Sequence, residues 1–245
     1  MRKIRQKRIT DSLIVAGVLL LILCLAYAGD YYPVTDEAAA MSETDTVKIR
    51  ETENGYLYDG PGEDTALIFY PGAKVQDISY AVLLKELAAN GIDCFLVHMP
   101  CNLALFGVNS ADEIIETYGY EHWYLAGHSL GGAMAAVYAS KNSETLDGLI
   151  FLAAYSTKDL SETDLNILLL YGSEDKVVNR EKIKEGRNFM PDTYEEYCIE
   201  GGNHAQYGDY GAQKGDGTAK IPAEEQQRIA AEKIEELCLD SQLGE

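Results

Sequence analysis

A serine between two glycines is the residue whose setting points most directly to chemistry. Ser129 lies in the sequence Gly127-His128-Ser129-Leu130-Gly131, after an apolar segment at 123–126 and before a segment rich in small residues at 130–141. This pattern predicts a strand, a tight turn and a helix, with glycines that let the two backbones approach closely. A serine on such a turn is exposed and can act as a nucleophile. The alternative is a glycine-rich turn with an ordinary helix-capping serine.

A serine hydroxyl needs a base, because it is a poor nucleophile at neutral pH. The chain has four histidines. His204 follows the last predicted strand, 194–199, in a loop that can return to the carboxyl edge of a sheet. His128 is adjacent to Ser129 and is poorly placed to reach the hydroxyl of its neighbour. We therefore predict that His204 is the base; the alternative for it is a surface-loop histidine.

The base in turn needs a carboxylate that orients its ring. Asp175 lies in the loop after the predicted strand at 167–171, and its neighbour Glu174 is the competing candidate. A carboxylate there can hold the imidazole tautomer and stabilise the imidazolium. The chain order Ser129, Asp175, His204 matches one of the known orders of the serine, acid and histidine triad.

Two backbone amides are needed to bind the oxyanion of an acyl-transfer intermediate. The amide of Leu130, directly after the nucleophile, is the first candidate. The second should come from the loop after the apolar segment at 66–70, where we expect Ala73, with Gly72 as the next choice. The alternative for this loop is a plain turn at the end of a strand.

The elements that must position these residues alternate along the chain. Short apolar runs alternate with segments of helical spacing, which predicts a mostly parallel sheet covered by helices on both faces. In such sheets, sites form in the loops beyond the carboxyl ends of the strands. Strands are predicted within 47–58 and at 66–70, 92–97, 123–126, 148–153, 167–171 and 194–199, and helices at 78–89, 111–118, 130–141, 180–189 and 223–238.

At this point the chain resembles the α/β-hydrolase superfamily, from about residue 65 to 237. The matching pieces are FYPGAKV (69–75), GHSLGG (127–132), YGSEDKVV (171–178) and GGNHAQYGDYG (201–211). More narrowly, it is similar to compact bacterial α/β hydrolases of the dienelactone-hydrolase-like group, many of which carry an N-terminal membrane segment. The resemblance implies the α/β-hydrolase fold and hydrolysis of an ester or related acyl bond. Dienelactone hydrolases proper use cysteine where this chain has Ser129, which favours an ordinary esterase.

The superfamily often inserts a lid domain before the strand that carries the acid. Here only residues 154–165 fill that gap, which is too short for a helical lid, so we predict an open site with no lid domain. Substrate-binding residues are harder to predict. Gly72 and three residues after the second core strand, Met99, Asn102 and Phe106, are candidates for the pocket wall. The glycine-rich segment 205–220, with Tyr207, either lines the cleft or is a surface loop.

The N-terminus carries a topological signal. Residues 1–8 hold five basic residues and no acid, and an uncharged apolar run follows at 13–28. This predicts either a signal anchor or a cleaved signal peptide with cleavage near Ala28, and both place the remainder outside the cytoplasm. We favour the anchor, that is, a single-pass protein of the cell membrane. The predicted organisation is an anchor or signal at 1–28, a linker at 29–46 and a catalytic domain at 47–245.

Composition and the absence of certain motifs exclude several classes of ligand. The formal net charge of −20 argues against nucleic acid and polyanionic substrates. No P-loop, dinucleotide fingerprint or clustered metal ligands are present, so we expect no cofactor and no metal. Cys94 is expected to be a buried free thiol; any pairing of the remaining cysteines, like the oligomeric state, is open. The prediction is a serine hydrolase acting on a small acyl substrate, with an acyltransferase, an inactive binding module or a peptidase as alternatives.

Overall fold

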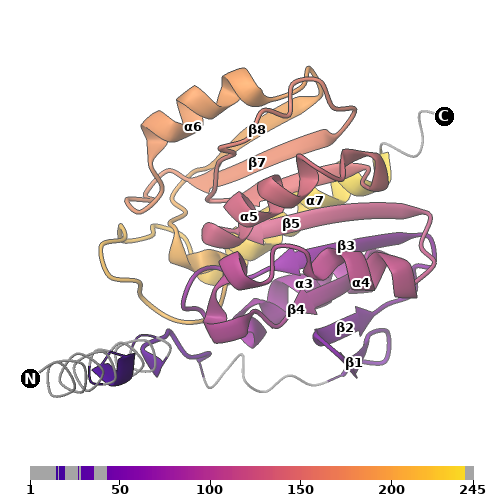
Figure 1. Cartoon of the computed structure of the whole chain (residues 1–245), viewed down its shortest axis with the longest axis horizontal. Helices are drawn as coiled ribbons and strands as arrows, with labels where there is room; N and C mark the ends of the chain where they lie inside the picture. Colours follow the sequence, from indigo (N-terminus) through magenta and orange to yellow (C-terminus); the bar gives the residue numbers. More distant parts are fainter. Residues whose placement is uncertain (1–14, 16, 20–26, 28, 36–42, 241–245) are drawn as a thin grey trace, which may run out of the picture. The chain divides into compact units, whose positions relative to one another are not determined.

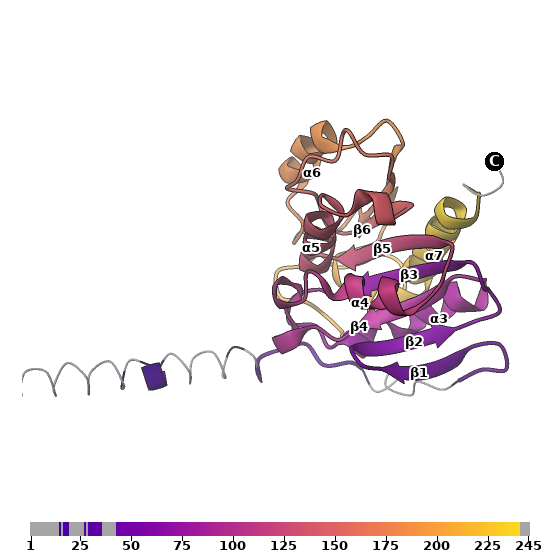
Figure 2. The same ribbon diagram turned by 45° about the vertical axis from the view of Figure 1, so that its right-hand side comes forward.

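Eight strands form a single sheet in the order β1-β2-β4-β3-β5-β6-β7-β8 (Figure 1). The strands are β1 (Lys48–Thr52), β2 (Gly55–Asp59), β3 (Thr65–Tyr70), β4 (Asp93–Val97), β5 (His122–His128), β6 (Gly148–Leu152), β7 (Asn166–Gly172) and β8 (Tyr194–Ile199). β1 pairs antiparallel with β2 and β2 antiparallel with β4, whereas all pairs from β4 to β8 are parallel. Figure 2 shows β1 and β2 together at one end of the sheet. The predicted mostly parallel sheet flanked by helices is confirmed.

The computed structural model describes residues 15, 17–19, 27, 29–35 and 43–240, in two units, 1–31 and 32–245. In the first unit, residues 15, 17–19, 27 and 29 are helical. Among the described residues, none belongs to a helix that is long and apolar enough to cross a bilayer. Most of the apolar run at 13–28 lies outside the described residues, and so does Cys24.

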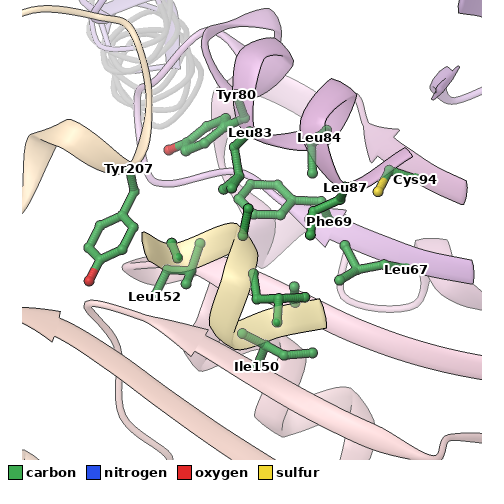
Figure 3. Close-up of a cluster of buried hydrophobic side chains, with 14 of the residues drawn as sticks. Leu67, Phe69, Tyr80, Leu83, Leu84, Leu87, Cys94, Ile150, Leu152 and Tyr207 are labelled. Carbon is green, nitrogen blue, oxygen red and sulfur yellow. The ribbon is translucent and has the colours of Figure 1, made fainter. Parts of the chain in front are cut away.

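Helices cover both faces of the sheet. They are α3 (Ala81–Ala89), α4 (Ser110–Thr117), α5 (Leu130–Ala139), α6 (Arg180–Gly186) and α7 (Ala223–Asp240). Successive side chains of a strand point to opposite faces, so the fully buried strand β3 contributes side chains to two hydrophobic cores, one on each face of the sheet. Leu67 and Phe69 pack with residues of α3 and α7, whereas Ala66 and Ile68 pack with residues of α4, α5 and α6. Figure 3 shows the first of these two cores.

The parallel register brings the carboxyl ends of β3, β5, β6, β7 and β8 to one edge of the sheet. The loops that follow β3, β5, β7 and β8 carry the residues predicted for chemistry. Between β6 and β7, residues 153–165 contain no helix or strand, in agreement with the prediction of no lid domain. Cys94 is buried and free, as expected, and the exposed Cys101 and Cys198 are also free.

Candidate active site

Ser129 sits on a strained turn between β5 and α5. Its φ of 52° and ψ of −117° are rarely adopted by a residue with a side chain. The amide of Ser129 donates to the carbonyl of Leu152 in the neighbouring strand at 2.9 Å, which fixes the turn to the sheet. Glycine is required on both sides. A Cβ at Gly127 would lie 2.4 Å from the backbone of Gly131, and one at Gly131 would lie 2.0 Å from the carbonyl oxygen of Tyr70.

The structure brings the predicted base and acid together. His204 Nδ1 lies 2.9 Å from Asp175 Oδ2, and both side chains are almost completely buried. The other carboxylate oxygen of Asp175 accepts the amides of Val177 and Val178, each at 2.8 Å. Those bonds orient the carboxylate, which in turn fixes the plane and tautomer of the imidazole. Glu174, the competing candidate, instead pairs with Lys220 at 2.6 Å.

Ser129 and His204 line the same cavity, which has a volume of about 280 Å³. His204 Nε2, the ring nitrogen that Asp175 does not hold, is buried and has no hydrogen-bond partner among the described residues. A buried nitrogen without a hydrogen-bond partner destabilises a folded protein, so such atoms are rare and often have a catalytic role. The remaining wall of the cavity is mostly apolar: Leu130, Ala133, Ala153, Ala154, Tyr155, Val177, Val178 and Asn179.

The two predicted oxyanion amides are both available. Leu130 is the first residue of α5, where amides have no partner within the helix and the helix dipole favours negative charge. In the loop after β3, the amide of Gly72 donates to the hydroxyl of Tyr80 at 3.0 Å and that of Lys74 to the carbonyl of Asn102 at 2.8 Å. The amide of Ala73, between them, donates to no described residue. Ala73 rather than Gly72 is therefore free to bind an oxyanion.

A buried hydrogen-bond chain behind the site was not predicted from the sequence. The hydroxyl of Tyr80 accepts from Gly72 and donates to His128 Nδ1 at 2.8 Å, and His128 Nε2 donates to the carbonyl of His204 at 3.1 Å. Burial, and then the neighbouring ring of His204, hold the pKa of His128 well below its ordinary value. His128 is therefore a neutral structural link between the loop after β3 and His204. Tyr80 follows no motif that would have marked it.

The other residues predicted to bind substrate lie away from the cavity wall. Met99 and Tyr207 are buried in the two cores of the sheet, and Gly72 is buried beside Tyr80 and His128. Asn102 supports the oxyanion loop through its carbonyl, and the side chain of Phe106 is 62% exposed. The residues that do line the cavity follow β6, β7 and Ser129. The only sequence signal that could have identified them is their position just after a predicted strand, where sites form in parallel sheets.

Within the described residues, no group of three or more His, Cys, Asp or Glu side chains is arranged to hold a metal ion.

Comparisons with known proteins agree on the fold. The family model described as the alpha/beta hydrolase family matches residues 66–228. A protein from Thermoplasma acidophilum predicted to be a CIB-like hydrolase is 14% identical, with a TM-score of 0.59 over 78% of this chain and 98% of that one. A protein from Klebsiella pneumoniae, named as a candidate dienelactone hydrolase, is 16% identical, with a TM-score of 0.60 over 79% and 98% of the chains. Among proteins of curated function, none matches in sequence.

Proposed function

Because this chain belongs to the α/β-hydrolase family, we propose that it is a serine hydrolase that cleaves an ester or related acyl bond through Ser129, His204 and Asp175. The observation that carries the proposal is the shared cavity of Ser129 and His204. A strained serine at a helix N-terminus faces the same space as His204. Asp175 holds Nδ1 of this histidine, and Nε2 has no hydrogen-bond partner in the part of the chain that the structure describes.

The mechanism follows from these positions. His204 Nε2 accepts the proton of Ser129 Oγ as the oxygen forms a bond to the acyl carbonyl carbon. The amides of Leu130 and Ala73 stabilise the negative oxygen of the tetrahedral intermediate. The intermediate collapses to the acyl-enzyme, and the leaving alcohol takes the proton from His204. Water, deprotonated by His204, then attacks the acyl carbon. The bond to Ser129 Oγ breaks, the acid leaves, and His204 returns the proton to Ser129 Oγ.

The cavity supports a small, uncharged acyl group as the substrate. Its volume of about 280 Å³ lies near the lower limit for small-molecule pockets. Ala133, Ala153 and Ala154 contribute only methyl groups to the wall, which leaves room for a few carbon atoms beside Ser129. An aliphatic acyl chain would be transferred from water to this apolar wall at a gain of about 0.8 kcal/mol per methylene.

The proposal is tested with a fluorophosphonate probe and a series of acyl esters of increasing length. The wild-type chain should be labelled and should hydrolyse the shorter esters, and Ser129→Ala should do neither. Ser140→Ala is the matched control, because Ser140 ends the same helix and its hydroxyl donates only to the carbonyl of Val137. Equal labelling of wild type and Ser129→Ala would refute the assignment.

We also propose that residues 1–28 anchor the catalytic domain at the outer face of the cell membrane. The support is the basic cluster at 1–8 followed by the uncharged apolar run at 13–28. Alkaline extraction should leave the protein in the membrane fraction. Protease added to spheroplasts or protoplasts, whose cell membrane is intact, should digest the catalytic domain. Release of the chain in soluble form, with a new N-terminus near position 29, would instead identify a cleaved signal peptide.

A further inference from the structure

Residues 32–35, here called the strap, precede the predicted catalytic domain but contact two of its catalytic loops. The sequence pattern predicted only a linker over 29–46. In the structure, Tyr32 forms a parallel β-bridge with Val75, and the strap belongs to the same compact unit as the rest of the catalytic domain.

On one side the strap holds the oxyanion loop, residues 72–76. The amide of Tyr32 donates to the carbonyl of Lys74 at 2.6 Å, and the amide of Gln76 donates back to the carbonyl of Tyr32 at 3.0 Å. The amide of Val34 donates to Gln76 Oε1 at 3.1 Å. These bonds begin one residue after Ala73, whose amide is the free donor of the loop.

On the other side the strap contacts the loop that follows the base, residues 205–214. The amide of Thr35 donates to the carbonyl of Asp209 at 2.8 Å, and the amide of Lys214 donates to the hydroxyl of Tyr32 at 3.3 Å. The ring of Tyr32 packs against that of Tyr210, with centroids 5.7 Å apart. The strap therefore joins the loop of Ala73 to the loop that begins directly after His204.

The oxyanion loop needs such support because its backbone is strained. Lys74 has a φ of 60°, a left-handed conformation that is unfavourable for a residue with a side chain. Strained backbone persists only where its surroundings hold it. The amide of Lys74 is held by the carbonyl of Asn102, and its carbonyl by the strap. An oxyanion donor works only if it is placed within a few tenths of an ångström before the reaction.

We propose that the strap is a positioning element of the active site, which holds the amide of Ala73 in place for the oxyanion. This inference rests on the proposed hydrolase function. It extends the functional domain upstream from residue 47 to residue 32. Tyr32 acts through the backbone of the oxyanion loop and Val34 through the side chain of Gln76. Neither is proposed to touch the substrate or the reacting atoms.

The test compares two proline substitutions, one residue apart, in the purified full-length chain. Tyr32→Pro removes the amide that donates to Lys74, whereas Tyr31→Pro removes an amide that donates to no described residue. Hydrogen exchange of peptides that cover 72–76 is measured by mass spectrometry, and kcat and KM are measured with a short acyl ester. Gln76→Met, which removes only the acceptor of the Val34 amide, serves if Tyr32→Pro does not fold.

We expect Tyr32→Pro to exchange faster at 72–76 and to lose about tenfold in kcat, with KM within twofold of wild type. Loss of an entire oxyanion donor typically costs about 100-fold to 1000-fold, and a displaced donor should cost less. Tyr32→Phe, which keeps the backbone bonds and the ring, should retain most of the activity.

Unchanged exchange at 72–76, unchanged kcat, or an equal loss in Tyr31→Pro would each overturn the proposal. If the strap only stabilised the fold, Tyr32→Pro would lower the melting temperature but leave kcat unchanged at temperatures well below it. That outcome would also contradict the proposal. A wild-type chain that hydrolyses no ester would refute the hydrolase function instead. The exchange experiment would still show whether the strap holds the loop.

Discussion

Replacing Tyr80 with Phe should destabilise the protein far more than the same replacement at Tyr207. Both tyrosines are fully buried, and both rings lie 5.7 Å from the ring of His128. Figure 3 shows both side chains at the same core. They differ in their hydroxyl groups. That of Tyr80 bonds to Gly72 and His128, whereas that of Tyr207 has no hydrogen-bond partner among the described residues.

The magnitude follows from the groups left behind. Tyr80→Phe leaves the amide of Gly72 and the Nδ1 atom of His128 unpaired in the interior. Each such group costs about 1–3 kcal/mol, and because the two share one network their costs do not add fully, so we expect roughly 2–4 kcal/mol. Tyr207→Phe removes a hydroxyl that satisfies nothing, so its effect should lie within about 0.5 kcal/mol of zero or be slightly stabilising.

Urea unfolding followed by the fluorescence of Trp123, the single tryptophan, measures both effects. With a denaturant slope of about 2 kcal/mol per molar, a loss of about 3 kcal/mol lowers the midpoint by about 1.5 M. Because the chain of hydrogen bonds ends at the oxyanion loop and at His204, kcat should also fall in Tyr80→Phe. Equal destabilisation by the two replacements would refute the reasoning, since it would mean that the hydrogen bonds of Tyr80 contribute nothing.

Three further predictions concern the site. Burial lowers the pKa of His128 below its ordinary 6.5, so at acid pH the unfolded chain binds a proton that the folded chain does not. The contribution of neutral His128 to the free energy of unfolding is therefore complete above pH 6.5 and is lost as the pH falls. The unfolding free energy of wild type minus that of His128→Gln should thus decrease by about 1 kcal/mol between pH 6.5 and 5.5, and a constant difference would contradict it. Asp175→Asn should lower kcat by about 100-fold to 10,000-fold, whereas Glu174→Gln should keep it within about threefold; similar losses would show that the wrong acid was assigned. Ala133→Leu should shift the acyl-ester profile toward shorter chains, with acetyl ester hydrolysis least affected, and an unchanged profile would place the acyl group elsewhere.

The sequence predicted the sheet because its central strands, such as β3, β4 and β6, are buried on both faces. Continuous apolar runs such as ALIFY at 66–70 and ILLLY at 167–171 place apolar side chains on both faces of a strand. Such a strand is stable only where helices cover both faces of the sheet. The end of α3 followed from a local signal, the Asn90-Gly91 stop, whereas α3 begins at Ala81 rather than 78 and α6 ends at Gly186 rather than 189, because a 3-10 turn adjoins each helix there. Ser129, Asp175 and His204 could be predicted for a related reason: each stands in a loop that follows a strand, and parallel strands bring such loops to one edge.

Contacts between distant segments could not be predicted in this way. The hydrogen bond between Tyr80 and His128 joins residues 48 positions apart, and that between Val34 and Gln76 joins residues 42 positions apart. No local pattern marks either pair. Only the packed structure shows that a polar stretch before the domain adds a bridge to the oxyanion loop. Local sequence therefore predicted which residues could react, through backbone propensity and burial. The tertiary structure decided what holds them, because hydrogen bonds between loops depend on distances that no single segment encodes.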